Sequence, residues 1–226
     1  MENPTTESSS ELARFNMIQQ QVRPWGVLDD RALDVMAEIQ RESFVPDAYR
    51  ALAYADIDIP IGEDSCMLHP KLVGHLLQAL QVHPGDKALE IGTGTGYVST
   101  CLSRLGARVT SIEIDPTLAS AARERLAALK VKNVDIREAD GLAMPMPGAP
   151  YDAIAVTGSM PTEAALPMLQ AQLAIGGRLF CVLGEAPVMT CLRIRRMSKD
   201  DFRREALFET FVPPLKNVAE PAGFEF

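Results

Sequence analysis

The feature that most constrains this chain is a strand-like segment that runs into a turn built on three glycines. Residues 88–97 read Ala-Leu-Glu-Ile-Gly-Thr-Gly-Thr-Gly-Tyr. Glycine lets a backbone turn sharply and approach a ligand closely, because no Cβ blocks a positive φ or close contact. The segment predicts a strand, a turn and a helix that together hold a nucleotide-like cofactor. A tight turn without a ligand is the alternative.

The spacing of the glycines distinguishes two classes of cofactor. A dinucleotide fold uses G-x-G-x-x-G, which requires a third glycine where this chain has Tyr97. Glu90, just ahead of the turn, suits a cationic group better than a pyrophosphate. S-adenosylmethionine carries a sulfonium and an ammonium and no phosphate, so the turn favours this cofactor. The candidate contacts in the turn are Glu90, Gly92, Thr93, Gly94, Gly96 and Tyr97.

Acidic residues end the next two expected strands. Glu113 ends the run 108–113, about twenty residues beyond the glycines, where a doubly wound fold places the residue that binds ribose hydroxyls. Asp115 competes for this role, although an acid before Pro116 is also typical of a helix start. Asp140, followed by Gly141, ends the next run and is positioned to accept from an adenine amino group, although Asp-Gly is also typical of a plain turn. With Glu90, acids stand at the ends of three successive expected strands, and the three together are stronger evidence for a cofactor site than any one alone.

The composition predicts a protein with a substantial core and no nucleic-acid partner. The chain has 226 residues, of which 47% are hydrophobic and 23% charged, enough for one well-packed domain with a modest appendage. A formal net charge of −8 argues against phosphate backbones as the main partner. The four cysteines show no C-x-x-C spacing and are expected to be free thiols in a reducing compartment. With no apparent signal sequence or membrane-spanning run, we expect a cytoplasmic monomer with no membrane partner.

The chain divides into four expected segments. Residues 1–10 are polar and are expected to form a disordered tail, and 219–226 form a C-terminal tail. Residues 11–85 form a helical N-terminal region, and 86–218 form the cofactor-binding core. Within the N-terminal region, apolar spacing predicts helices over 11–22 and 30–39 and a third helix from Pro70. The loop between the second and third helices is expected to help cover the cofactor crevice.

The core alternates strands with helices, which predicts an α/β fold with a doubly wound, mostly parallel sheet. An antiparallel hairpin over 188–197 and 202–211 is expected to close one edge of the sheet. Ligands of such sheets bind outside the carboxyl ends of the strands. The expected strands lie near 87–91, 108–113, 134–138, 151–157 and 177–183, and the expected helices cover 96–105, 117–129 and 161–173.

Several short motifs give the chain a family resemblance. They include Arg41-Glu-Ser-Phe-Val-Pro46, Ile59-Pro-Ile-Gly62, the glycine motif, Tyr151-Asp-Ala-Ile-Ala-Val-Thr157 and Phe211-Val-Pro. On these motifs the chain, from about Met17 to Leu215, resembles the protein-L-isoaspartate O-methyltransferases, a branch of the class I S-adenosylmethionine-dependent methyltransferases. The resemblance implies a Rossmann-like fold with an N-terminal helical cap. It also implies methylation of a carboxylate on a protein, a peptide or a small molecule.

The resemblance also assigns roles and shows where this chain departs from its relatives. It implies that Glu90, Gly92 and Gly94 line the methionine end of the cofactor, that Glu113 binds the ribose, and that Asp140 and Gly141 lie by the adenine. After Pro-x-Gly the family usually carries Gly-x-Gly-Gln-Thr-Ile-Ser-Gln-Pro, whose Thr and Ser line the site where cofactor and acceptor carboxylate meet. Residues 62–70 have the same length, with Cys66 for the Thr, Leu68 for the Ser and His69 for the second Gln. Because Leu68 cannot donate a hydrogen bond to a carboxylate, we expect impaired or absent isoaspartyl repair with cofactor binding retained.

Few side chains are available to replace the missing hydroxyl. Ser65 and His69 are the catalytic candidates. Ser65 offers a neighbouring hydroxyl, and His69 offers a hydrogen-bond donor or a base. A histidine that only packs at the start of a helix is the simpler interpretation of His69. Cys66 is expected to be structural because its apolar neighbours give no reason for a lowered thiol pKa. Thr157, after the fourth core strand, is a candidate cofactor contact or a plain turn residue. The histidines lack metal-ligand spacing, so no metal site is expected.

Two functions from different classes remain. One is an S-adenosylmethionine-dependent O-methyltransferase with a modified acceptor pocket. The other is a non-catalytic or regulatory protein that binds S-adenosylmethionine or S-adenosylhomocysteine. Nicotinamide-dependent reduction is disfavoured by the glycine spacing.

Overall fold

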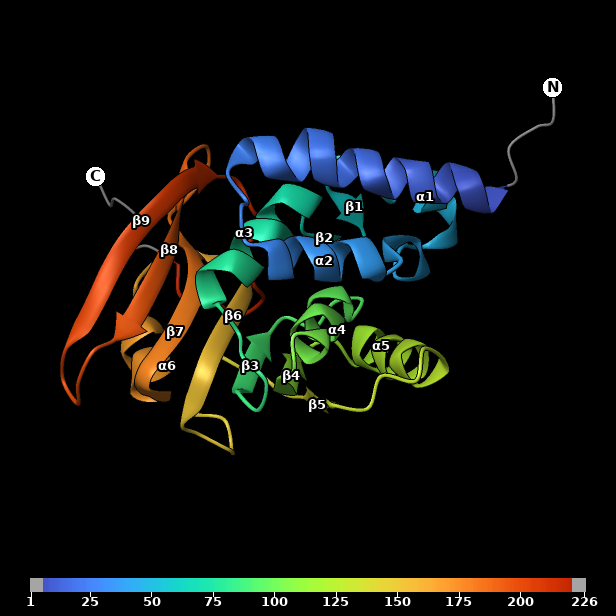
Figure 1. The fold of residues 1–226 in the computed structure, drawn as a ribbon. Coiled ribbons are helices and arrows are strands. Elements are labelled where there is room, and N and C mark those ends of the chain that lie inside the picture. Colours follow the sequence, from blue (N-terminus) through green and yellow to red (C-terminus); the bar gives the residue numbers. More distant parts are fainter. Residues whose placement is uncertain (1–5, 221–226) are drawn as a thin grey trace, which may run out of the picture.

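A single seven-stranded sheet organises the computed structural model, which describes residues 6–220. The strand order is β5-β4-β3-β6-β7-β8-β9, and strands β3 to β7 are parallel to one another (Figure 1). The chain builds outward from β3 to β5 and then returns to the other side of β3, so the topological switch point lies between β3 and β6. The parallel strands are β3 (Lys87–Ile91), β4 (Arg108–Glu113), β5 (Val134–Glu138), β6 (Tyr151–Met160) and β7 (Leu173–Leu183).

The expected C-terminal hairpin is confirmed. Strand β8 (Met189–Arg196) runs antiparallel to β7, and β9 (Phe202–Thr210) runs antiparallel to β8. An ion pair between Arg193 and Glu205, 2.6 Å apart, joins neighbouring positions of the two strands. The hairpin places the chain after Thr210 so that it returns along the end of β6.

Helices cover the sheet unequally. Helices α3 (Pro70–Leu80), α4 (Tyr97–Arg104) and α5 (Pro116–Ala128) pack with α2 (Asp30–Glu38) into one large core. On the other face, α6 (Leu166–Ala171) and the loop after β5 enclose a second core. Strand side chains alternate between the two, as Ala88 and Leu89 do, because successive residues of a strand point to opposite faces. Helix α6 is shorter than the expected 161–173, and β7 begins at Leu173, earlier than expected.

The N-terminal region begins with a helix that starts earlier than expected. Helix α1 (Thr6–Asn16) continues as a π-helix over Met17–Val22 and a short 3-10 turn over Arg23–Trp25. Residues 6–10, expected to be part of a disordered tail, are therefore helical, whereas residues 1–5 and 221–226 lie outside the described residues. Figure 1 shows α1 lying outside α2 and α3.

Helix α2 (Asp30–Glu38) is capped as its sequence suggests. The Asp29 carboxylate accepts hydrogen bonds from the N–H groups of Arg31 and Ala32 at 2.9 and 3.3 Å. A side-chain cap of this kind satisfies two of the four free N–H groups at a helix start. The Asp29 side chain therefore marks the start of α2.

The segment between α2 and α3 is ordered by short elements. Two 3-10 helices, Arg41–Ser43 and Asp47–Leu52, lead into a small antiparallel pair, β1 (Ile59–Pro60) and β2 (Cys66–Met67). Their turn lies beside the glycine turn after β3. The loop expected near the cofactor crevice therefore forms one of its walls.

Candidate active site

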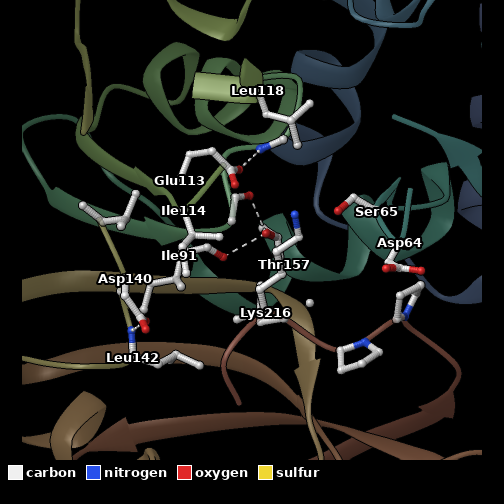
Figure 2. Close-up of a pocket in the computed structure, with 18 of the residues that line it drawn as sticks. Asp64, Ser65, Ile91, Glu113, Ile114, Leu118, Asp140, Leu142, Thr157 and Lys216 are labelled. Atoms are coloured by element: carbon white, nitrogen blue, oxygen red, sulfur yellow. Dashed lines mark hydrogen bonds between the residues drawn. The ribbon is translucent and has the colours of Figure 1, made fainter. Parts of the chain in front are cut away.

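A crevice of about 730 Å³ opens at the carboxyl ends of the parallel strands. Its floor comes from the glycine turn, and its walls come from the ends of β4, β5 and β6, the β1–β2 turn and the chain after β9. Figure 2 shows Glu113 and Asp140 on one side, Asp64 and Ser65 on the other, and Thr157 between them. Seven of the predicted site residues line this crevice: Ser65, Gly92, Gly94, Glu113, Asp140, Gly141 and Thr157.

The glycine turn requires glycine at its first and second positions because of both backbone conformation and space. Gly92 and Gly94 have φ values of +94° and +53°, in the left-handed region. A Cβ on Gly92 would lie 2.4 Å from the Thr157 Oγ1, and one on Gly94 would lie 3.0 Å from Ile61 Cδ1. Gly96 is the residue before α4 and faces Leu126, so it shapes the turn without lining the crevice.

Glu113 stands at the end of β4 with its carboxylate fixed by main-chain donors. Its Oε2 accepts from the Gly94 N–H at 2.8 Å, and its Oε1 accepts from the Asp115 N–H at 3.0 Å. Each oxygen retains a lone pair for a further donor. Asp115 instead caps α5 through the N–H groups of Thr117 and Leu118 and does not line the crevice. The geometry therefore favours Glu113 of the two competing acids.

Asp140 and Gly141 form the wall next to the end of β5. The Asp140 Oδ1 accepts from the Leu142 N–H at 2.9 Å, and Oδ2 accepts from the Asn217 amide at 3.3 Å. Gly141 lies against Ile91, since a Cβ there would come within 2.9 Å of that side chain. Isoleucine and leucine side chains, among them Ile112 and Leu142, form an apolar slot in the same crevice.

A smaller cavity of about 340 Å³ lies on the other side of the glycine turn, under α3 and the β1–β2 pair. Glu90, Thr93 and Tyr97 line this cavity rather than the crevice, and Cys66 lines both. Leu68 also faces it. The two spaces share Ile61, Cys66, Gly92, Gly94 and Thr157, so they are neighbours across the turn.

Glu90 is fully buried beneath the turn. Its Oε2 accepts from the hydroxyls of Ser99 and Ser111, the latter at 2.5 Å, whereas its Oε1 has no hydrogen-bond partner among residues 9–220. Burial raises the pKa of Glu90 to about 7, and the two serine hydroxyls oppose that rise. A buried carboxylate with a free oxygen is suited to receive a positively charged donor.

Of the three replaced loop residues, Cys66 and Leu68 face the cavities. Cys66 is half-buried, and burial together with the Asp58 carboxylate raises the pKa of its thiol to about 12. A thiol of this kind is protonated at neutral pH and is a weak nucleophile, which is consistent with a structural Cys66. Ser65 places its side chain in the crevice.

The structure does not bring His69 to either cavity. It is the residue before α3, and its ring lies between Asp56 and Asp58, with Nε2 3.1 Å from the Asp58 Oδ1. Lys71 also pairs with Asp56, at 2.7 Å. His69 therefore packs with Asp56, Asp58 and Lys71, outside both cavities.

One wall of the crevice, formed by residues 212–216, was not predicted from the sequence. Residues 212–216 run past the end of β6, where the Ser159 N–H donates to the Pro213 carbonyl and the Leu215 N–H donates to the Ser159 carbonyl, both at 3.0 Å. Ser159 also donates through its hydroxyl to the Val212 carbonyl at 2.8 Å. The Phe211-Val-Pro motif was the signal for this segment, but nothing in its residue types indicates a ligand contact.

The charges of the crevice favour a cationic ligand. Three carboxylates line it, from Asp64, Glu113 and Asp140, against one lysine, Lys216, which pairs with Asp115 at 3.2 Å. Within residues 6–220, no group of three or more His, Cys, Asp or Glu side chains is arranged to hold a metal ion. The same residues include no helix that is long and apolar enough to cross a membrane.

Comparison with known proteins agrees with this geometry. The profile of the family "Protein-L-isoaspartate(D-aspartate) O-methyltransferase (PCMT)" matches residues 13–218. Protein-L-isoaspartate O-methyltransferase 1 of Rhodopseudomonas palustris (strain HaA2) is 40% identical over 94% of this chain and 87% of its own. The protein-L-isoaspartate O-methyltransferase of Methylorubrum populi is 40% identical over 92% of this chain and 98% of its own.

Solved structures show the same fold. A protein-L-isoaspartate O-methyltransferase superposes with a TM-score of 0.78 at 25% identity, over 90% of this chain and 66% of that longer one. A Plasmodium falciparum protein, described as a putative protein-L-isoaspartate O-methyltransferase in complex with S-adenosyl-L-homocysteine, superposes with a TM-score of 0.75 at 19% identity over 92% of this chain and 98% of its own. The chain belongs to the protein-L-isoaspartate(D-aspartate) O-methyltransferase family.

Proposed function

We propose that this methyltransferase binds S-adenosylmethionine in the crevice and methylates a carboxylate through an acceptor pocket that differs from the family pattern. The observation that carries the proposal is the convergence of Glu113, Asp140 and the glycine turn on one space at the switch-point edge of the sheet. Family membership makes the chain an S-adenosylmethionine-dependent O-methyltransferase. The finer assignments below rest on the geometry.

The residues present fit the cofactor. The two free lone pairs of the Glu113 carboxylate match the two hydroxyls of a ribose, while its other contacts to Gly94 and Asp115 keep it in place. Asp140 beside the apolar slot matches an adenine with its amino group. Gly92 and Gly94 let the ligand pass close to the backbone, and the carboxylates of the crevice suit its positive charge.

The reaction needs positioning more than acid–base chemistry. S-adenosylmethionine supplies a methyl group on a sulfonium, and an ionised carboxylate attacks it without a general base. Holding the two reactants in line is worth about 7–11 kcal/mol of the barrier. The chain therefore has to orient the acceptor carboxylate and exclude water, which the loop 61–66 and the segment 212–216 are placed to do.

The acceptor pocket lacks the family's hydroxyls. Cys66 and Leu68, which replace them, both face the cavities, so the change of chemistry lies at the site itself. Ser65, next to Cys66 in the sequence, still places a hydroxyl in the crevice wall. We propose that this hydroxyl orients the acceptor. Because the structure places His69 outside both cavities, Ser65 is preferred to His69 for this role. The acceptor is a carboxylate on a protein, a peptide or a small molecule, and efficient repair of isoaspartyl peptides is not expected.

A direct assay tests this proposal. The full chain is incubated with methyl-labelled S-adenosylmethionine and an isoaspartyl peptide, beside a panel of carboxylate acceptors, and label transfer is measured. We expect weak or no transfer to the isoaspartyl peptide and transfer to another carboxylate. Turnover of the isoaspartyl peptide at a rate typical of the family contradicts the changed pocket.

The isobutyl group of Leu68 in the pocket also favours a second candidate, a protein that binds the cofactor without turnover. Calorimetry with S-adenosylmethionine and S-adenosylhomocysteine separates the two. Tight binding of both, with no transfer to any acceptor in the panel, supports the second candidate.

A further inference from the structure

Asp64 is a carboxylate of the crevice that has no role in the protein or in the proposed binding of the cofactor. It lines the crevice from the turn between β1 and β2, next to Ser65, and it is exposed. Among residues 9–220, no ion pair joins Asp64 to a lysine, arginine or histidine. Figure 2 shows Asp64 across the crevice from Glu113 and Asp140. An unpaired charge in the wall of a binding site acts on the ligand that comes next to it.

The neighbouring acids already have partners. Asp56 pairs with Lys71 at 2.7 Å, and Oδ1 of Asp58 lies 3.1 Å from Nε2 of His69. On the opposite wall, the two carboxylates near the ends of β4 and β5 accept main-chain hydrogen bonds and face the proposed nucleoside. Asp64 is therefore the carboxylate that is left to meet the second reactant.

The crevice offers little positive charge to an acidic acceptor. Lys216 is the one lysine or arginine among the residues that line it, and Lys216 pairs with Asp115 at 3.2 Å. The guanidinium of Arg41 is fully buried and belongs to the smaller cavity. The reacting carboxylate meets the sulfonium of the cofactor, but the lining residues provide nothing that offsets further negative charge beside it. The formal net charge of −8 on the chain acts in the same direction.

The positions of Ser65 and Asp64 separate two parts of an acceptor. Ser65 is half-buried, whereas Asp64 is exposed at the rim of the crevice. With Ser65 orienting the reacting carboxylate, Asp64 faces the group next to it. Consecutive Cα atoms lie about 3.8 Å apart in this loop as in a peptide acceptor. The residue beside the reacting one is therefore the part of a peptide that comes within range of Asp64.

We propose that Asp64 selects acceptors in which a lysine or arginine stands next to the carboxylate that is methylated. This inference rests on the proposed function, because it presupposes that the acceptor reaches the methyl group past Ser65. In the register of the family motif, Asp64 takes the place of the second glycine, so the selection belongs to the part of the loop where this chain departs from that motif. The favoured acceptor is a peptide segment with local positive charge, and an acidic segment is disfavoured.

Peptides that differ only in the charge beside one carboxylate test the inference. Each short peptide has blocked termini and a central aspartyl residue flanked on both sides by lysine, alanine or glutamate, and a second set carries isoaspartyl at the centre. Every peptide is titrated calorimetrically into the full chain saturated with S-adenosylhomocysteine. The measured quantity is the affinity, so the comparison does not require turnover.

A matched control separates a local charge from the net charge. The variants are Asp64→Asn and Asp64→Lys, and the control is Asp200→Lys. Asp200 is exposed in the turn between β8 and β9. Because β8 runs antiparallel to β7, this turn lies at the amino ends of the parallel strands, at the opposite edge of the sheet from the crevice. Asp200→Lys therefore changes the net charge as much as Asp64→Lys does, and thermal unfolding of each variant reports whether it is folded.

At low salt, the wild-type chain should bind the lysine-flanked peptide at least about tenfold more tightly than the glutamate-flanked one, because each exposed charge pair changes affinity by about 1.5- to fivefold. Asp64→Asn should reduce this ratio about threefold or more, and Asp64→Lys should abolish or reverse it. Asp200→Lys should leave the ratio within about twofold of wild type, and raising the salt concentration should reduce the wild-type ratio.

Two results overturn the inference. One is an unchanged ratio in Asp64→Lys, and the other is a wild-type chain that binds no lysine-flanked peptide. Both leave the cofactor site of the proposed function standing. Failure of the wild-type chain to bind S-adenosylhomocysteine contradicts the proposed function itself.

Discussion

The Oε2 of Glu113 accepts a hydrogen bond from the Gly94 N–H at 2.8 Å. This bond joins the end of β4 to the turn after the neighbouring strand β3, so Glu113 and the glycine turn are parts of one site. It also orients the carboxylate toward the crevice, because both of its oxygens are already held by main-chain N–H groups. The relationship explains why the two motifs point to the same ligand.

Replacing Glu113 should weaken cofactor binding far more than replacing its neighbour. In the proposed site Glu113→Ala removes two charge-assisted hydrogen bonds to the ribose, each worth about 1.5–3 kcal/mol, so S-adenosylhomocysteine affinity should fall by about two to four orders of magnitude. Asp115→Asn is the control, since it perturbs the cap of α5 and should change stability by at most about 1 kcal/mol with little effect on affinity. Calorimetry that shows the larger loss in the Asp115 variant would reverse the assignment.

Adding a methyl group to the glycine turn should block binding. Gly94→Ala places a Cβ 3.0 Å from Ile61 in a residue with φ of +53°, so it both strains the turn and narrows the entrance. Gly176→Ala has the same kind of strain, with φ of +83°, but its Cβ meets nothing within 4 Å. We expect both variants to lose about 1 kcal/mol of stability and only Gly94→Ala to lose cofactor affinity. Equal affinities in the two variants would show that the turn does not touch the ligand.

The ionisation of Glu90 should make the stability of the ligand-free protein depend on pH. Burial raises the pKa of Glu90 to about 7, above its ordinary value of 4.5, so the folded state binds more protons than the unfolded state between these values. The stability that Glu90 contributes is therefore present below about pH 4.5 and is lost as the pH rises through about 7. Glu90→Gln should gain stability relative to wild type on going from pH 5 to pH 8, by on the order of 3 kcal/mol at most. Thermal unfolding at both pH values measures this, and a constant difference between the two proteins refutes it.

Restoring a hydroxyl at position 68 should restore part of the family chemistry. Leu68→Ser puts a donor into the cavity wall, so label transfer to an isoaspartyl peptide should rise while S-adenosylhomocysteine affinity stays within a few-fold of wild type. The substitution should cost about 2–5 kcal/mol of stability, because Leu68 is buried. Leu33→Ser, at a buried position that lines neither cavity, should cost a similar amount without any gain in transfer. No gain in the Leu68 variant would mean that the hydroxyl is not what limits repair.

The Cys66 thiol should be unreactive despite being half-exposed. With its pKa raised to about 12, the thiolate fraction at pH 8 is small, so alkylation by iodoacetamide should be at least tenfold slower than that of a free thiol. Asp58→Asn should accelerate the reaction, because the Asp58 carboxylate is one cause of the raised pKa. Mass spectrometry of the labelled peptide measures both rates. Rapid alkylation of the wild-type Cys66 would point to a nucleophilic role instead.

Local pattern was sufficient to predict most of the core. Local signals predicted these elements correctly. They are the apolar runs of the parallel strands, the prolines at helix starts (Pro70 and Pro116) and the alternating segments after Val188. The placement of Glu113 and Asp140 at one edge of the sheet was also predictable, because the carboxyl ends of parallel strands share one edge.

Features that depend on tertiary contact were not predictable. The early start of α1 is accompanied by a contact from Ser10 to Glu42, which is distant in sequence. The orientation of His69 toward Asp56 and Asp58, and the return of residues 212–216 to the end of β6, depend on how separate segments meet.

A crystal structure of the full chain with S-adenosylhomocysteine tests the central claim most directly. The account predicts the ribose hydroxyls on the Glu113 carboxylate, the adenine beside Asp140, and the sulfur at the glycine turn where the two cavities meet. A nucleoside bound elsewhere, or one whose ribose does not contact Glu113, would contradict it.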